Sequence, residues 1–494
     1  MARQPRIVWF QNNNDHYFVR MIDALNARGD AVYFPVFLCP PPGAAERATE
    51  GTQERGGPET RAGGKRGCTG GNGRATEGKA GNGTSGFACY GGPVPKGPHA
   101  FLGRPGRPGR LRADARAYVR GLGCDVVILG GYNSLFKLWV MRHCCRRGIP
   151  CCLFADSNIR SERGESFLPR LAPAAHENGP LALRRPAQRR RFAPRSSFSG
   201  PINAPPEPGA APPRLHRPSP AFPRPTSLQS LKRLAKKLFL PRVIARLTRI
   251  IPVNRCGVAY WRYYGSPRDK IRRSTYFCRL DLLDEARSRS REETLARHGL
   301  PADGKLIFTA ARLAPVKGLD LMLTAFQQAR LTERGWVWAI AGDGQLRNQL
   351  VTLTRSDAGR SIRFLGHQAP TEIMALMLHS NLFILPSWYE PHGIVVTEAL
   401  AAGTPVIASE VGGAAVDLVQ PYRTGWRFRN GDAADLQRVL IEATADPARL
   451  AAMRPACTAA FQRWYAQYAP TKVIPELIRE LCRGAPNRCS LSPL

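Results

Sequence analysis

Short apolar runs alternate with helical segments from Leu306 onward, and this alternation constrains the fold more than any other feature of the chain. Runs such as LIFTAAR, VWAIAGDG and LFILPS are rich in strand-forming residues, and segments such as LDLMLTAFQQAR carry apolar residues at helical spacing. Repeated strand and helix units predict a parallel sheet covered by helices on both faces. We therefore expect a doubly wound α/β domain over residues 291–460.

The first part of the chain shows the same pattern more sparsely. RIVWF from Arg6, a helical segment ending at Gly29 and AVYFPVFL from Ala31 read as strand, helix and strand. A chain of 494 residues exceeds what one hydrophobic core usually organises, so a second α/β domain over residues 1–290 is expected. Residues 461–494 are predicted to form a C-terminal helix that packs back on this first domain.

Two stretches of the first part differ in composition from the rest. Residues from about 40–108 and 162–225 are rich in Gly, Pro and Arg and poor in aliphatic side chains. Such sequence buries too little apolar surface to offset the conformational entropy lost on ordering. We predict that both stretches are disordered insertions in the N-terminal domain.

The chain carries 72 Lys and Arg against 37 Asp and Glu, a formal net charge of +35. Such a charge spread over a folded surface would indicate nucleic acid or anionic membrane as a partner. Much of it lies instead in the low-complexity stretches. Specific nucleic-acid recognition is therefore not expected, although polyanion binding through the basic insertions stays open as an alternative.

The 13 cysteines include no C-x-x-C pair, which is typical of free thiols in a reducing compartment rather than of a zinc site. The N-terminus has no apolar segment ahead of a cleavage site, and no run of 18 apolar residues occurs. These features predict a cytoplasmic protein that does not span the membrane, with peripheral contact at its inner face left open.

That contact is suggested by the segment Leu228–Leu240. Its leucines repeat at helical spacing, and lysines and arginines surround them. A basic amphipathic helix can lie on anionic lipid. The alternative is an ordinary helix that docks its leucine stripe on the domain and keeps its charges in water.

The run EPHGIVVTEALAAG combines two carboxylates with a helix start. Gly393 allows close backbone approach to a ligand, and the free amides at the start of the predicted helix suit phosphate oxygens. Glu390 precedes that helix and Glu398 lies inside it, so both carboxylates flank the anion site. Carboxylates in these positions suit neutral hydroxyl groups such as those of ribose and of a sugar.

Positive charges for the same site come from AARLAPVKG, which places Arg312 and Lys317 in the loop after the first strand of the second domain. Two cations in such a loop can neutralise a diphosphate and stabilise it as a leaving group. The turn AGDGQL contributes Gly342 and Gly344, which can admit a nucleotide, although such turns are common on protein surfaces.

These motifs, with RFLGH, VGG and DLVQPYRTGW, occur in the order and approximate spacing of glycosyltransferase family 4, which this chain resembles over roughly residues 306–450. That family comprises retaining sugar-nucleotide transferases of the GT-B fold. The resemblance implies an α/β chain of two doubly wound Rossmann-like domains facing across a cleft. Glu390 and Glu398 look like the family's E-x7-E motif.

The resemblance also implies a role for each matching residue. Arg312 and Lys317 would hold the diphosphate, and Glu398 would bind the ribose. Glu390, with the backbone amides of His392, Gly393 and Ile394, would bind the donor sugar and phosphate. Leu365 in RFLGH, Gly342 and Gly344 would complete the donor site. The family often has Phe where this chain has His392.

The first half matches the family more loosely. QNNNDHYF stands where members often have a Gly-rich turn, so Asn14 and His16 would present polar side chains on the acceptor side. Asp156 follows a predicted strand where many relatives place a His near the sugar. It is either part of the catalytic site or a buried or capping residue.

Taken together, these features predict a retaining glycosyltransferase of the hexosyltransferase type, which moves a sugar from a nucleoside diphosphate sugar to a hydroxyl of a glycan or lipid-linked acceptor. No acidic D-x-D pair is placed to hold a metal, so no cofactor and metal-independent catalysis are expected. The alternatives are a retaining glycan phosphorylase, or an inactive GT-B scaffold that binds polyanions.

Overall fold

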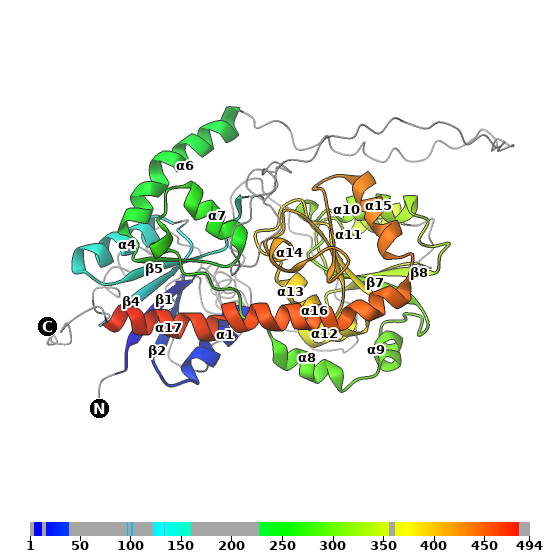
Figure 1. Cartoon of the computed structure of the whole chain (residues 1–494), viewed down its shortest axis with the longest axis horizontal. Helices are drawn as coiled ribbons and strands as arrows, with labels where there is room; N and C mark the ends of the chain where they lie inside the picture. Colours follow the sequence, from blue (N-terminus) through cyan, green and yellow to red (C-terminus); the bar gives the residue numbers. More distant parts are fainter. Residues whose placement is uncertain are drawn as a thin grey trace, which may run out of the picture.

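The computed structural model describes residues 4–11, 16–38, 96, 100–101, 121, 123–132, 134–159, 227–354 and 361–483. Two α/β domains lie side by side, each built around a parallel sheet (Figure 1). Nearly all of the predicted insertions at 40–108 and 162–225 lies outside the described residues.

The first domain contains a six-stranded parallel sheet in the order β3-β2-β1-β4-β5-β6. Its strands are β1 (Arg6–Gln11), β2 (Val32–Phe37), β3 (Ala100–Phe101), β4 (Val126–Gly130), β5 (Cys151–Ala155) and β6 (Arg249–Pro252). The chain order reverses between β1 and β4, and such a switch point is where doubly wound sheets bind ligands, at the carboxyl ends of the strands.

The second sheet, also parallel, has the order β12-β11-β10-β7-β8-β9, the same topology as the first. Its strands are β7 (Lys305–Ala310), β8 (Trp336–Ala341), β9 (Ile362–Gly366), β10 (Leu382–Leu385), β11 (Val406–Ser409) and β12 (Gly425–Phe428). Its switch point lies between β7 and β10. The two Rossmann-like domains predicted from the sequence are thus confirmed.

Helices cover both faces of each sheet. The helices of the first domain are α1 (His16–Asn26), α4 (Leu135–Arg147), α6 (Ser227–Arg246), α7 (Arg255–Tyr263) and η2 (Arg268–Lys270). Those that follow are α8 (Leu280–Arg287), α9 (Arg291–Arg297), η3 (Pro315–Lys317), α10 (Leu319–Gln328), α11 (Arg347–Leu353), α12 (Pro370–His379), α13 (Ile394–Ala401), α14 (Gly413–Leu418), α15 (Ala433–Ala443), α16 (Pro447–Tyr468) and α17 (Pro470–Arg483).

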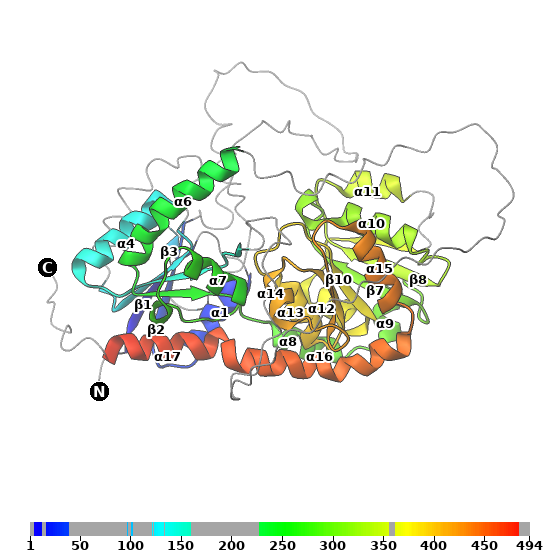
Figure 2. The ribbon, with the colours of Figure 1, turned by 45° about the horizontal axis from the view of Figure 1, so that its top comes forward.

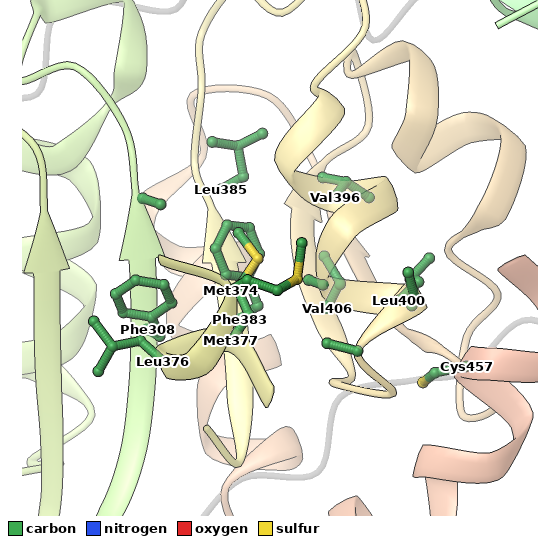
Figure 3. Packing of buried hydrophobic residues seen from close by; sticks show 14 of the residues in the cluster. Phe308, Met374, Leu376, Met377, Phe383, Leu385, Val396, Leu400, Val406 and Cys457 are labelled. Carbon is green, nitrogen blue, oxygen red and sulfur yellow. The ribbon is translucent and has the colours of Figure 1, made fainter. Parts of the chain in front are cut away.

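The sheets are buried on both sides, as their unbroken apolar strands require. On β7, Phe308 packs in one core cluster, whereas Ile307, the preceding residue, packs in the cluster on the other face. Figure 3 shows the first of these clusters, in which Phe308 and Phe383 of the sheet lie close to Met374 of α12. These cores hold the strand ends that carry the candidate site.

The last two helices join the domains along one side of the molecule (Figures 1 and 2). Phe461 and Trp464 of α16 pack in the core of the second domain, whereas Ile474 and Leu477 of α17 pack in the core of the first. The chain therefore passes between the domains twice, once before α8 and once between α16 and α17.

Hydrogen bonds connect the two passages. The Ser274 hydroxyl donates to the Tyr468 carbonyl at 3.2 Å, and the Cys278 amide donates to the Tyr465 hydroxyl at 3.1 Å. The Arg273 guanidinium lies over the Tyr468 ring, 3.9 Å from its centroid. The crossing segments thus form one structural unit.

Two further helices involve the segments RSTYFCRLDLL and LARHGLPADG, which lie between the two runs of strand and helix units. The structure forms α8 within the first and ends α9 within the second. Ser290 caps α9 in a capping box with Glu293, which favours a helix start. Leu282 and Ala286 of α8 pack in the core of the second domain, so that core begins ahead of residue 291.

The helix predicted near residues 228–240 is α6, and its first half extends beyond the body of the domain (Figure 1). Leu234 and Leu238 are 54% and 61% exposed, whereas Leu240 and Ile244 are buried in the core. The interpretation that the leucine stripe docks on the domain is therefore wrong for Leu234 and Leu238. No helix in the described part of the chain has the length and hydropathy to cross a membrane.

Candidate active site

The switch point of the second sheet brings two of the predicted site residues into contact. Lys317 ends η3 in the loop after β7, and Glu390 lies in the loop after β10. The Lys317 ammonium lies 2.7 Å from a Glu390 carboxylate oxygen, and the Ser387 hydroxyl donates to the same oxygen at 3.3 Å. Both charged side chains are largely shielded from solvent, so this is a strong and well-oriented pair.

Helix α13 begins beside this pair. Gly393 precedes the helix at φ 86°, in the left-handed region, and a Cβ there would lie 3.1 Å from Glu390 Cγ. Glycine is therefore required both by the backbone and by the approach of Glu390. Among the described residues no side chain caps the helix start, which leaves the amides near Ile394 suited to an anion.

Glu398 lies one turn farther into α13 and is only 4% exposed. The Tyr17 hydroxyl, on α1 of the first domain, donates to its carboxylate at 2.8 Å. Burial raises the pKa of Glu398 to about 7, while the Tyr17 hydrogen bond and the charge of Arg279 act in the opposite direction. This acid therefore connects the two domains.

Two buried asparagines of the first domain hold the Glu390 loop by its backbone. The Asn158 amide lies within hydrogen-bonding distance of the carbonyls of Glu390 at 3.2 Å, Pro391 at 3.1 Å and Val411 at 2.8 Å. The Asn254 amide donates to the Pro391 carbonyl at 2.9 Å. Domain packing thus fixes the position of the loop that carries Glu390.

Sequence reasoning selected Asp156 in the ADSN motif rather than Asn158. Asp156 is exposed, and Asn158, two residues later, is buried against the second domain. The ADSN sequence indicates that polar residues follow β5 at the carboxyl edge of the first sheet. To choose between Asp156 and Asn158, one must know where the second domain packs, and the ADSN sequence does not contain that information.

His392 is buried between aromatic rings of two other segments. Its ring centroid lies 5.2 Å from that of Tyr276 and 6.4 Å from that of Trp464. Burial lowers the pKa of His392 to about 3, and the nearby charge of Arg273 acts in the same direction. Within the described ranges its Nε2 atom has no hydrogen-bond partner, so the ring acts as a neutral packing group.

The remaining predicted donor residues surround the same loops. Arg312 is exposed in the loop that follows β7. A Cβ on Gly342 would overlap the Ala311 carbonyl, and one on Gly344 would lie 2.6 Å from the Leu313 carbonyl oxygen. These glycines therefore allow the turn to pack on the Arg312 loop. Leu365 is partly buried against the core cluster of the second domain that contains Phe308 and Phe383.

The predicted acceptor-side residues are only partly visible. Asn14 lies outside the described residues, and so does the side chain of His16, the first residue of α1. Across the described segments no group of His, Cys, Asp and Glu side chains could hold a metal ion.

Sequence reasoning also missed a buried ion pair between the domains. The Asp417 carboxylate, on α14, accepts from Arg273 in the first crossing segment and lies 3.9 Å from Arg255 of α7. Burial raises the pKa of Asp417, while both arginines favour its charged form. The spacing of these residues along the chain offered no signal for the pairing.

Similarity to known sequences is concentrated in the second domain. Residues 290–458 match the family model described as Glycosyl transferases group 1. The glycogen synthase of Mycobacterium tuberculosis is 36% identical over 154 residues, covering 31% of this chain and 37% of that enzyme. The D-inositol 3-phosphate glycosyltransferase of Streptomyces bingchenggensis is 33% identical over 165 residues, covering 31% and 36%. The chain thus spans little more than a third of the curated relatives it matches.

Solved structures match over nearly the whole chain. Anabaena HepE in complex with UDP and glucose gives a TM-score of 0.57 at 13% identity, covering 97% of this chain and 99% of that one. WaaG, a glycosyltransferase involved in lipopolysaccharide biosynthesis, gives 0.55 at 14% identity, covering 97% and 100%. At these identities the likeness shows the fold alone. The GT-B architecture expected from the sequence is confirmed.

Proposed function

We propose that this chain is a retaining glycosyltransferase that moves a sugar from a nucleoside diphosphate sugar to an acceptor hydroxyl of a glycan or lipid-linked molecule. The observation that carries the proposal is the Lys317–Glu390 pair beside the uncapped start of α13. This places a cation, a carboxylate and helix amides at the switch point of a doubly wound sheet. The match of residues 290–458 to group 1 glycosyl transferases supports it.

In this proposal Arg312 and Lys317 neutralise the diphosphate, and the amides of His392, Gly393 and Ile394 bind its oxygens. Lys317 has three N–H donors, so it can keep its bond to Glu390 while donating to phosphate. One Glu390 oxygen accepts hydrogen bonds from Lys317 and Ser387, which fixes the carboxylate beside the start of α13. In the proposal this carboxylate accepts from a hydroxyl of the donor sugar. Glu398 accepts a hydrogen bond from the ribose.

Retention of configuration is proposed to follow from attack on the face that the diphosphate leaves. The bond from the anomeric carbon to the diphosphate oxygen breaks, and the bond to the acceptor oxygen forms on the same face. The acceptor proton passes to the departing phosphate oxygen, so no carboxylate nucleophile is required. The charge on the departing group is stabilised by Arg312 and Lys317, which is why we propose catalysis without a metal ion.

Donor turnover tests this function. Release of UDP, GDP or ADP from a panel of nucleotide sugars should occur for one nucleotide, and an excess of EDTA should leave the rate unchanged. Glu390→Gln should lower kcat by about 10²-fold or more, because the sugar loses a charged hydrogen-bond acceptor. Turnover that requires inorganic phosphate would support the phosphorylase instead, and folded protein that binds no nucleotide would support the inactive scaffold.

A second proposal concerns the acceptor and places α6 against an anionic membrane surface. Its sequence contains no acidic residue, and its described cations include Lys237 and Arg242. Leu234, Leu238 and Phe239 are exposed among them, a combination that suits lipid tails and anionic headgroups together.

Binding to vesicles tests this contact. The full chain should sediment with vesicles of phosphatidylglycerol and phosphatidylcholine, and Leu238→Gln should weaken that binding roughly threefold or more, since less apolar surface is buried. Ile441, exposed on α15 of the other domain, provides the matched control as Ile441→Gln. Equal binding of both variants would contradict the proposal.

A further inference from the structure

Tyr17 is the residue of the first domain that reaches the proposed ribose-binding acid. It lies in the first turn of α1, which follows β1 at the carboxyl edge of the first sheet. Its hydroxyl donates to a Glu398 oxygen at 2.8 Å, although the residues are 381 positions apart. Within the described residues, no other side chain hydrogen-bonds to that carboxylate.

The chemistry of this contact matches that of the proposed substrate. A phenol hydroxyl and a ribose hydroxyl are both neutral O–H donors, and each can satisfy a buried carboxylate in the same way. Glu398 is almost fully buried, and Tyr17 contributes to that burial from the opposite domain. A ribose hydroxyl that binds Glu398 must therefore reach a carboxylate that already accepts from the Tyr17 hydroxyl.

We propose that the Tyr17 hydroxyl and a ribose hydroxyl of the donor are alternative partners of Glu398. Tyr17 thereby sets the affinity for the donor, because each nucleotide must replace an existing hydrogen bond at a buried acceptor. This inference rests on the proposed function, which makes Glu398 the ribose-binding acid. It assigns to α1 a role that the donor-binding motifs of the second domain do not contain.

The contact also makes donor binding dependent on how the domains are arranged. Tyr17 and Glu398 belong to different domains, so any separation of the two edges breaks their hydrogen bond. A ribose bound to Glu398 compensates for that loss, since a buried carboxylate without a donor is costly. Binding of the nucleotide and release of Tyr17 are thus one coupled exchange.

The test compares nucleotide affinities of the native chain and Tyr17→Phe by calorimetry. Removing the competing hydroxyl should tighten binding of the nucleoside diphosphate that the native chain prefers by roughly threefold to tenfold. The 2′,3′-dideoxy form of that nucleotide and inorganic pyrophosphate lack the ribose hydroxyls and should bind both proteins equally. Tyr263→Phe, on the exposed surface of α7, is the matched control and should leave all affinities unchanged.

Two results would overturn the inference. Weaker or equal binding of the nucleotide by Tyr17→Phe would show that Tyr17 supports Glu398 or is irrelevant to it. An equal gain for the dideoxy nucleotide would show that the ribose hydroxyls do not compete with Tyr17. Failure of the proposed function is distinguishable, because then the native chain would bind none of UDP, GDP or ADP.

Discussion

Lys317 and Glu390 form an ion pair of 2.7 Å between the loops that follow β7 and β10. These two strands are neighbours across the switch point of the second sheet, so their carboxyl ends bring the loops together. The pair fixes one oxygen of Glu390 and keeps an ammonium group beside the start of α13.

We expect Lys317→Met to lower kcat by about 10²- to 10³-fold, because the departing diphosphate loses a preorganised cation. Steady-state kinetics with the preferred donor measures this effect. Lys305→Met serves as the control, because Lys305 lies at the exposed start of β7, the strand that precedes the Lys317 loop. A native rate in Lys317→Met would exclude Lys317 from leaving-group stabilisation.

Asn158→Ala should reduce kcat/KM for the donor about tenfold and lower the free energy of unfolding by about 1–3 kcal/mol. Three carbonyls of the second domain lose their buried donor in this variant, so the Glu390 loop is no longer fixed. Asn348→Ala, on the surface of α11, controls for loss of an asparagine.

Asp156→Asn, measured beside Asn158→Ala, tests the role predicted for Asp156. If Asp156 is catalytic, the Asp156→Asn variant should lose activity with little change in stability, since this side chain is exposed.

If Asn158→Ala were fully active and fully stable, the three interdomain hydrogen bonds of Asn158 would have no functional importance.

Glu398 should make the fold less stable as the pH rises. Its folded pKa of about 7 exceeds the ordinary value of 4.5, so the folded state keeps a proton that the unfolded state has lost between these values. Stability is therefore fully present below pH 4.5 and decreases toward pH 7 by up to about 3 kcal/mol. Urea unfolding at several pH values should show this slope in the native chain, and its absence in Glu398→Gln would confirm the source.

His392 should produce the opposite dependence on pH. Its folded pKa of about 3 lies below the ordinary value of 6.5, so stability is present above pH 6.5 and decreases as the pH falls. Phe fits the same aromatic surroundings without a titrating nitrogen. We expect His392→Phe to gain about 2 kcal/mol relative to the native chain between pH 6.5 and 5.

Acid unfolding of native protein, His392→Phe and the surface control His367→Gln measures this difference. The His367→Gln curve should follow that of the native chain. An identical acid dependence in all three proteins would mean that His392 takes up a proton in place, which its burial argues against.

The sequence contained enough to predict both domains, because a buried parallel strand must be apolar on both faces and its connecting helix must be amphipathic. Leu306 to Ala310 and Leu382 to Leu385 show this plainly. The helix α9 was missed although Ser290 and Glu293 are a readable capping box. Its seven residues are too few for apolar periodicity to outweigh the turn residues that follow.

The meeting of Lys317 and Glu390 was predictable, since both follow strands of one sheet at its carboxyl edge. The partners from the other domain were not. Tyr17 reaches Glu398, and Asn158 reaches the Glu390 loop, only because the two finished domains dock in one orientation. That orientation depends on packing over many side chains, so no local motif encodes it.

The two passages of the chain between the domains have a mechanical consequence. Ser274 and Cys278 of one passage bond to Tyr468 and Tyr465 beside the other, so the two passages are held together. We therefore expect the domains to open by rotating near these passages rather than by sliding past each other. A protease cut in one passage alone would leave the second intact, and the two halves would stay joined.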